Sequence, residues 1–180
     1  MKTYFANIVS LLRIPFSLGF CAVLLTDGPF RIAIAIFLLI VMTDNADGVI
    51  ARKSNSETTF GATLDVFTDL FFMVTASVTM AHLNMLPYWI VIVMIAKFIE
   101  FRYTSSICTQ HQKDHGHMHD PVGRLNAACF YALPATSLLF IEQLDNSSEA
   151  ITAVCIILTI MAFVSTTMRI RMVQRTKIRN

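Results

Sequence analysis

Residues 43–69 read TDNADGVIARKSNSETTFGATLDVFTD and contain four aspartates, Asp44, Asp47, Asp65 and Asp69. The chain around them is 55% hydrophobic, only 14% of its 180 residues are charged, and its mean hydropathy is +0.61. A charged side chain at the centre of a bilayer costs about 3 kcal/mol even on mild insertion scales. Four carboxylates in so apolar a chain therefore indicate a functional site.

The apolar content is distributed in segments long enough to span a membrane. A helical crossing needs about 20 apolar residues. Six stretches qualify, at residues 7–26, 30–52, 61–81, 86–108, 123–141 and 151–168. We therefore expect an all-α integral membrane protein with six transmembrane helices, forming a single membrane domain over residues 1–180.

The basic residues predict how these helices are oriented. Lys2 precedes the first segment, Arg52 and Lys53 close the second, and a basic tail follows the sixth, whereas the opposite loops carry Arg31 as their only basic residue. Basic residues collect on the cytoplasmic side of a membrane, so we expect both termini to be cytoplasmic. The net charge of +2 is small, and we expect the tail to anchor at the membrane surface rather than to bind nucleic acid.

The spacing of the aspartates predicts that they meet. Asp44 and Asp47 are three residues apart, Asp65 and Asp69 are four apart, and the polar run 53–60 lies between the two pairs. Each pair then shares one helix face, and the two helices are antiparallel neighbours. At a rise of 1.5 Å per residue, Asp47 and Asp65 both lie roughly 8 Å inside their helix ends. We expect a polar, metal-lined cavity that opens to the cytoplasmic side.

Four close carboxylates need compensating charge in a low dielectric. Either two protons or two divalent cations can supply it, and carboxylate oxygens with room for water and phosphate suit Mg²⁺ or Mn²⁺. Gly48 and Gly61 would permit close approach of a helix or a nucleotide. Arg52 supplies a fixed positive charge for a phosphate. The sequence therefore favours a two-metal site for phosphoryl transfer.

This pattern resembles a known signature. The matching residues are Asp44, Asp47, Gly48, Ala51, Arg52, Gly61, Asp65 and Asp69. In residue type and spacing they resemble the signature of the CDP-alcohol phosphatidyltransferases. The resemblance extends to the six expected helices and to the chain length. It implies transfer of a phosphatidyl group from CDP-diacylglycerol to a hydroxyl of a small water-soluble acceptor, with release of CMP, by a homodimer embedded in membrane lipids.

The resemblance also implies a role for each matching residue. Asp44, Asp47, Asp65 and Asp69 would bind two divalent ions, Mg²⁺ or Mn²⁺. Asp69 would in addition act as the general base. The CDP moiety would lie against Gly48, Ala51, Arg52 and Gly61.

The acceptor is less clearly indicated. Basic residues that could meet it are Lys97, Arg102, Arg124, Arg169 and Arg171. If two or three converge, they favour a phosphate-bearing acceptor such as glycerol 3-phosphate or another phospho-polyol. The alternative acceptors are inositol and serine. The alternative role of these basic residues is to extend to the lipid headgroups. Arg13, within the first apolar segment, is a further candidate to face the polar cavity.

Two other interpretations remain open at this point. Intramembrane carboxylates also occur in cation or proton transporters, although transporter sites tend to lie near the midplane and between inverted repeats. Here the aspartates lie towards one side of the membrane, and no repeat is visible. His111, His115, His117 and His119 could bind a transition metal, but we interpret residues 111–120 as a solvated loop.

Overall fold

The structure is almost entirely helical. The computed structural model describes residues 8–54, 59–111 and 120–178, and within them the side chains of residues 45–54, 59–60, 62, 105–111 and 175–178 lie outside the description. The long helices of this described part are α2 (Arg13–Leu25), α3 (Phe30–Ser54), α4 (Thr59–His82), α5 (Tyr88–His111), α6 (Pro121–Gln143) and α7 (Ser147–Ile178). The prediction of an all-α fold is confirmed.

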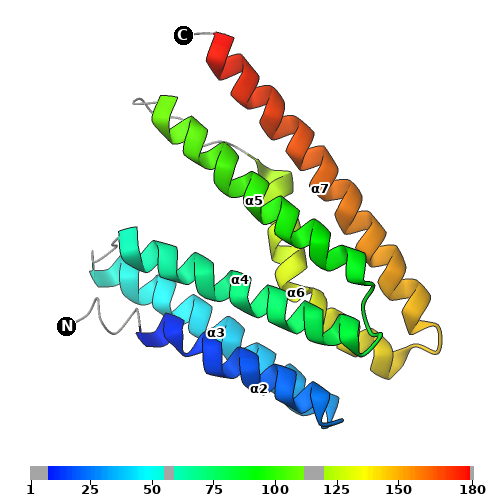
Figure 1. Ribbon diagram of the computed structural model, residues 1–180. Helices are drawn as coiled ribbons and strands as arrows, with labels where there is room; N and C mark the ends of the chain where they lie inside the picture. The colour runs from blue at the N-terminus through cyan, green and yellow to red at the C-terminus, as the bar shows by residue number, and fades with distance from the viewer. Residues whose placement is uncertain (1–7, 55–58, 112–119, 179–180) are drawn as a thin grey trace.

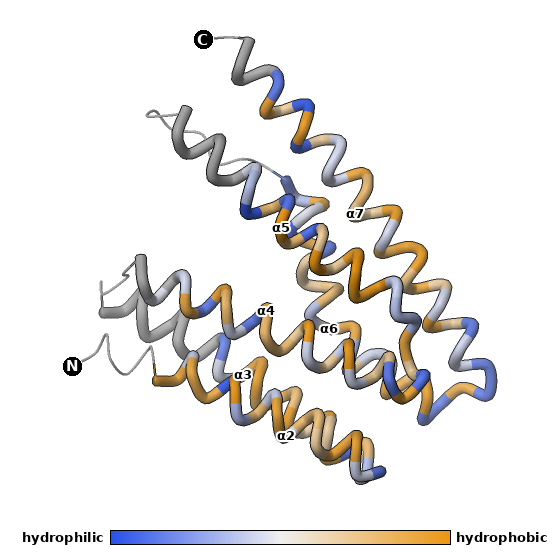
Figure 2. Tube along the Cα trace, in the orientation of Figure 1, coloured by the Kyte–Doolittle hydropathy of each residue, from blue (hydrophilic) through white to orange (hydrophobic). Residues whose placement is uncertain are grey.

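Several of the helical segments have the length and composition of membrane spans. Four segments of the described chain are long and apolar enough to cross a bilayer: Ile8–Leu25, Thr63–His82, Pro121–Gln143 and Ser147–Gln174. Figure 2 shows hydrophobic residues along most of each helix, with hydrophilic residues at the α6–α7 turn. The chain is thus a multi-pass membrane protein, and crossing by α3 and α5 stays a prediction.

The helices form two groups (Figure 1). In the first, α2 packs against both α3 and α4; in the second, α7 packs against both α5 and α6. The groups meet where α6 contacts α3 and α4, and where α5 contacts α4. We expected α3 and α4 to face each other, and within the described residues the rings of Phe37 on α3 and Phe72 on α4 do lie 5.9 Å apart. The closest packing of each of these helices is against α2. This arrangement brings a side chain of α2 between the acidic faces of α3 and α4.

Short turns keep sequential helices close. Asp27 and Asn84 adopt left-handed backbone conformations, with φ of 53° and 57°, at the ends of α2 and α4. Aspartate and asparagine tolerate this region better than most residues. The Met85 amide donates to the Met80 carbonyl at 2.8 Å, which satisfies a carbonyl at the end of α4. The chain therefore reverses direction within a few residues after α2 and after α4.

Aromatic rings pack where the first group meets α6. Phe72 of α4 is fully buried, and its ring centroid lies 5.7 Å from that of Phe20, 5.9 Å from that of Phe37 and 5.3 Å from that of Tyr131. These partners come from α2, α3 and α6. Association of membrane helices depends largely on such close packing, so Phe72 is central to the junction of four helices.

We predict that Phe72→Ala lowers the free energy of unfolding by about 3–5 kcal/mol, because it leaves a cavity among these rings. Thermal unfolding in detergent measures the change. Phe163→Ala is the matched control, since Phe163 is 71% exposed on α7. Equal unfolding temperatures for the two variants would contradict the packing role of Phe72.

Candidate metal and phosphate site

Three of the sequence-predicted aspartates come together in the structure. Asp44 projects from α3, and Asp65 and Asp69 project from successive turns of α4. Each offers one carboxylate oxygen, and these oxygens all lie within 4.8 Å of one another. The three side chains are half-buried. The i, i+4 spacing on α4 places Asp65 and Asp69 on one face, and the packing of α2 on both helices brings that face towards Asp44.

The guanidinium of Arg13 lies inside this carboxylate cluster. Its Nη1 is 2.6 Å from Asp65 Oδ1 and 2.7 Å from Asp69 Oδ1, and its Nη2 is 3.1 Å from Asp44 Oδ1. The Arg13 side chain is completely buried, and its Nη1 also lies 3.3 Å from Thr68 Oγ1. A buried charge is tolerated when it is paired and hydrogen-bonded. Arg13 and the aspartates therefore stabilise one another.

The carboxylate cluster fits a divalent cation. Three carboxylate oxygens at this mutual distance are the hard ligands that Mg²⁺ and Mn²⁺ prefer. One guanidinium compensates only one of the three negative charges of Asp44, Asp65 and Asp69, so the cluster retains a negative charge that attracts cations. These aspartates would hold a metal ion, and Arg13 contacts one oxygen of each.

The rest of the signature lies on the same two helices, α3 and α4. Asp47, Gly48, Ala51 and Arg52 follow Asp44 along α3, and their side chains lie outside the described residues. Gly61 is within the first turn of α4 and is partly buried. Their assignment to metal and CDP binding stays a prediction. The loop residues that include His115, His117 and His119 also lie outside the described part.

A cavity of about 340 Å³ adjoins the carboxylate cluster. Asp44 and Asp69 line it together with two of the basic residues singled out in the sequence, Lys97 and Arg102 of α5. Most of the remaining lining is apolar, contributed by α4, α5 and α6. The cavity therefore lies between the two groups of helices, with carboxylates and cations on its wall.

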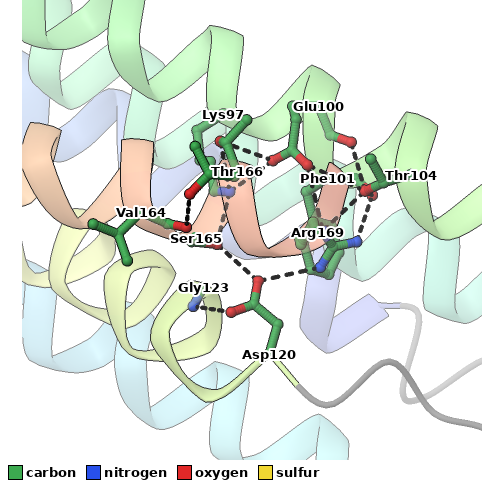
Figure 3. A network of polar contacts seen from close by, with 11 residues as sticks. Lys97, Glu100, Phe101, Thr104, Asp120, Gly123, Val164, Ser165, Thr166 and Arg169 are labelled. Carbon is green, nitrogen blue, oxygen red and sulfur yellow. Dashed lines mark hydrogen bonds and ion pairs between the residues drawn. The ribbon is translucent and has the colours of Figure 1, made fainter. Parts of the chain in front are cut away.

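A polar network fixes the cation-bearing side of this cavity (Figure 3). Asp120 caps α6: its Oδ1 accepts from the Gly123 amide at 2.7 Å, and its Oδ2 accepts from Ser165 Oγ on α7 at 2.7 Å. A Cβ at Gly123 would clash with the Asp120 carboxylate and lie 2.7 Å from Ser165 Oγ. Glycine is thus required here by the close approach of α7 to the first turn of α6.

The same network pairs Lys97 and Arg169 with acidic residues. Lys97 Nζ donates to Glu100 Oε2 at 2.6 Å, to Ser165 Oγ at 2.8 Å and to a threonine hydroxyl of α7. Arg169 is 2% exposed; its Nε is 3.4 Å from Glu100 Oε1, and its Nη1 is 3.5 Å from Asp120 Oδ2. The negative charges of Glu100 and Asp120 thus balance the positive charges of Lys97 and Arg169. These ion pairs connect α5, α6 and α7.

The five candidate acceptor residues thus occupy different settings. Lys97 lines the cavity but is held by Glu100, and Arg169 is buried among acidic partners. Arg124 and Arg171 are exposed and are not among the residues that line this cavity. Arg102 lines the cavity and forms no hydrogen bond or ion pair with another described residue. Its guanidinium is therefore the one best placed to meet an anionic ligand.

The sequence predicts one of these ion pairs, between Lys97 and Glu100, but not the pairs that join different helices. The sequence predicts that Arg13 faces the polar cavity, but it does not predict that its buried guanidinium contacts Asp44, Asp65 and Asp69 together. Asp120 was read as part of a solvated loop, although Asp followed by Pro and a helical segment is a recognisable N-cap signal. Glu100 carried no signal beyond its i, i+3 spacing from Lys97, because its contact with Arg169 depends on tertiary packing.

Comparison with known proteins agrees with the signature. A family model described as CDP-alcohol phosphatidyltransferase matches residues 3–168. A Bacillus subtilis protein named CDP-diacylglycerol–glycerol-3-phosphate 3-phosphatidyltransferase is 36% identical over 69 residues, covering 38% of this chain and 35% of the relative. A Mycobacterium tuberculosis protein named a probable phosphatidylglycerophosphate synthase is 31% identical over 97 residues, covering 51% and 46%.

A Mycobacterium bovis protein with the provisional name cardiolipin synthase is 30% identical over 91 residues, covering 51% of this chain and 44% of the relative. The alignments thus span less than half the length of each of these curated relatives.

We predict that Arg13→Gln destabilises the metal-free protein, because three clustered carboxylates lose their buried counter-charge. Removing one partner of a buried pair costs about 3–5 kcal/mol, and we expect the lower end since the aspartates are 31–40% exposed. Mn²⁺ should restore more stability to this variant than to the wild type. Thermal unfolding in EDTA and in Mn²⁺ measures both effects.

Arg31→Gln is the control for this comparison, because Arg31 is 88% exposed in its pair with Glu142 and such pairs contribute little. An Arg13 variant as stable in EDTA as the Arg31 variant would show that the aspartates need no counter-charge from α2.

Proposed function

Because this chain belongs to the CDP-alcohol phosphatidyltransferase family, a family of transferases, we propose that it transfers a phosphatidyl group from CDP-diacylglycerol to glycerol 3-phosphate or another phospho-polyol. The observation that carries the proposal is the cavity whose wall includes Asp44 and Asp69 as well as Lys97 and Arg102. Such a cavity offers a metal-binding wall for a pyrophosphate and a guanidinium for a second phosphate. Residues 1–180 would act as one catalytic unit.

The aspartates and the acceptor would act together in the reaction. The acceptor hydroxyl attacks the phosphorus nearest the diacylglycerol, a new O–P bond forms, and the bond to CMP breaks. Asp69 takes the hydroxyl proton as general base. In the structure Arg13 engages Asp69 Oδ1, while Oδ2 has no partner among the described residues. Bound divalent ions, Mg²⁺ or Mn²⁺, supply charge neutralisation for the pyrophosphate and the leaving group.

The acceptor proposal draws on Arg102 and on the relatives. Arg102 is a cavity-lining cation without a partner among the described residues, and planar guanidinium groups bind phosphate through paired hydrogen bonds. The B. subtilis relative is named for glycerol 3-phosphate. Inositol and serine are the alternative acceptors, and a screen with CDP-diacylglycerol and each acceptor in turn separates them.

We also propose a location and an assembly. The basic residues at the ends of the segments favour six crossings with both termini in the cytoplasm, and a site that opens to the cytoplasm would give access to a water-soluble acceptor. The family resemblance favours a homodimer in the cytoplasmic membrane.

We predict that the wild type releases CMP from CDP-diacylglycerol when Mg²⁺ or Mn²⁺ and glycerol 3-phosphate are supplied in detergent or liposomes. Asp69→Asn should lower kcat on the order of 10²–10⁴-fold, because the base is lost, while the protein stays folded. Asp145→Asn, in the exposed α6–α7 turn, is the matched control. Cation flux without CMP release would favour a transporter instead.

We further predict that Arg102→Gln raises the KM for glycerol 3-phosphate by roughly 10-fold or more, since a charge-assisted contact to phosphate is lost. The KM for CDP-diacylglycerol should stay unchanged. Steady-state CMP release gives both values, with Arg31→Gln as the control. A wild-type KM for glycerol 3-phosphate in the Arg102 variant would remove this residue from the acceptor site.

A further inference from the structure

Tyr131 of α6 lies where three helices meet. Its ring centroid is 5.3 Å from that of Phe72 on α4 and 6.1 Å from that of Phe37 on α3. These contacts involve the ring alone. A phenylalanine at this position would make the same contacts, so the packing does not explain the hydroxyl.

The Tyr131 hydroxyl is buried and has no hydrogen-bond partner among the described residues. Burying a hydroxyl without a partner costs stability. Buried phenols usually find a partner, and a group that violates this rule calls for an explanation. Such violations are expected mainly at functional sites. The hydroxyl therefore points to a partner that arrives with a ligand.

The surroundings of Tyr131 indicate what that ligand carries. Tyr131 lines the same cavity as Asp44 and Asp69. The carboxylate oxygens Asp44 Oδ1 and Asp69 Oδ1 are already engaged by Arg13. A phenol O–H can donate one hydrogen bond, and an anionic oxygen held near the cluster is the acceptor that suits it best.

We propose that the Tyr131 hydroxyl donates a hydrogen bond to a phosphoryl oxygen of the substrate bound in this cavity. The inference rests on the proposed function, in which the donor brings a pyrophosphate and the acceptor brings a phosphate. The pyrophosphate of the donor and the phosphate of the acceptor both offer phosphoryl oxygens that can accept this hydrogen bond. Because the hydroxyl is shielded from water, the bond forms in a low dielectric, where it is stronger than in water. The protein thus keeps an unpaired donor ready for the ligand.

The experiment compares Tyr131→Phe with the wild type, using Tyr88→Phe as the matched control because Tyr88 is exposed at the start of α5. Unfolding temperature is measured without ligand, and binding of CDP and of inorganic pyrophosphate is measured in Mn²⁺. CMP release then gives separate KM values for CDP-diacylglycerol and glycerol 3-phosphate. We expect Tyr131→Phe to be as stable as the wild type or more stable, and to bind its ligand about 10- to 100-fold more weakly.

The pattern of the losses identifies the source of the phosphoryl oxygen. Weaker CDP and pyrophosphate binding assigns Tyr131 to the donor, whereas a raised KM for glycerol 3-phosphate alone assigns it to the acceptor. Unchanged binding and turnover would overturn the inference, and so would a lower unfolding temperature with unchanged ligand response, which marks a structural hydroxyl. If the wild type binds CDP more tightly than Tyr131→Phe does but releases no CMP with any acceptor, the proposed transfer is refuted and this inference still holds.

Discussion

The ion pairs between the buried Arg13 and three aspartates join α2, α3 and α4. A fully buried guanidinium needs carboxylates around it, and carboxylates clustered within 4.8 Å need a cation among them. Because these residues come from α2, α3 and α4, the requirement fixes how the three helices pack. It also holds the carboxylate oxygens at a spacing that a divalent ion can use.

In the second group of helices, α5, α6 and α7, the buried charges are paired with one another. Lys97, Glu100, Asp120 and Arg169 form a network in which acids and bases balance, so α5, α6 and α7 are joined without an external ion. The carboxylate cluster keeps a surplus of negative charge instead. Its charge would favour a cation, whereas Arg102, on the other helix group, is the cavity-lining residue that we propose for an anion.

Much of the fold and of the candidate site could be predicted from the sequence. Hydrophobic segments of about 20 residues predicted helices whose bounds differ by few residues from those of α3, α4 and α5. The spacing of Asp44, Asp65 and Asp69 predicted that the carboxylates would meet. The acceptor residues were harder to predict, because Arg102 and Arg169 look alike in the sequence and only one of them is surrounded by acidic side chains from other helices.

The sequence by itself determined the class of the protein, the carboxylates of its candidate metal site and the helices that carry them, because apolar segment length and helical periodicity are local properties. Only the tertiary structure decided that α2 packs against both α3 and α4, that Arg169 is enclosed while Arg102 lines a cavity, and that the Tyr131 hydroxyl is buried with no partner among the described residues. These features depend on which side chains of different helices come within a few ångströms, and no spacing along one helix encodes that.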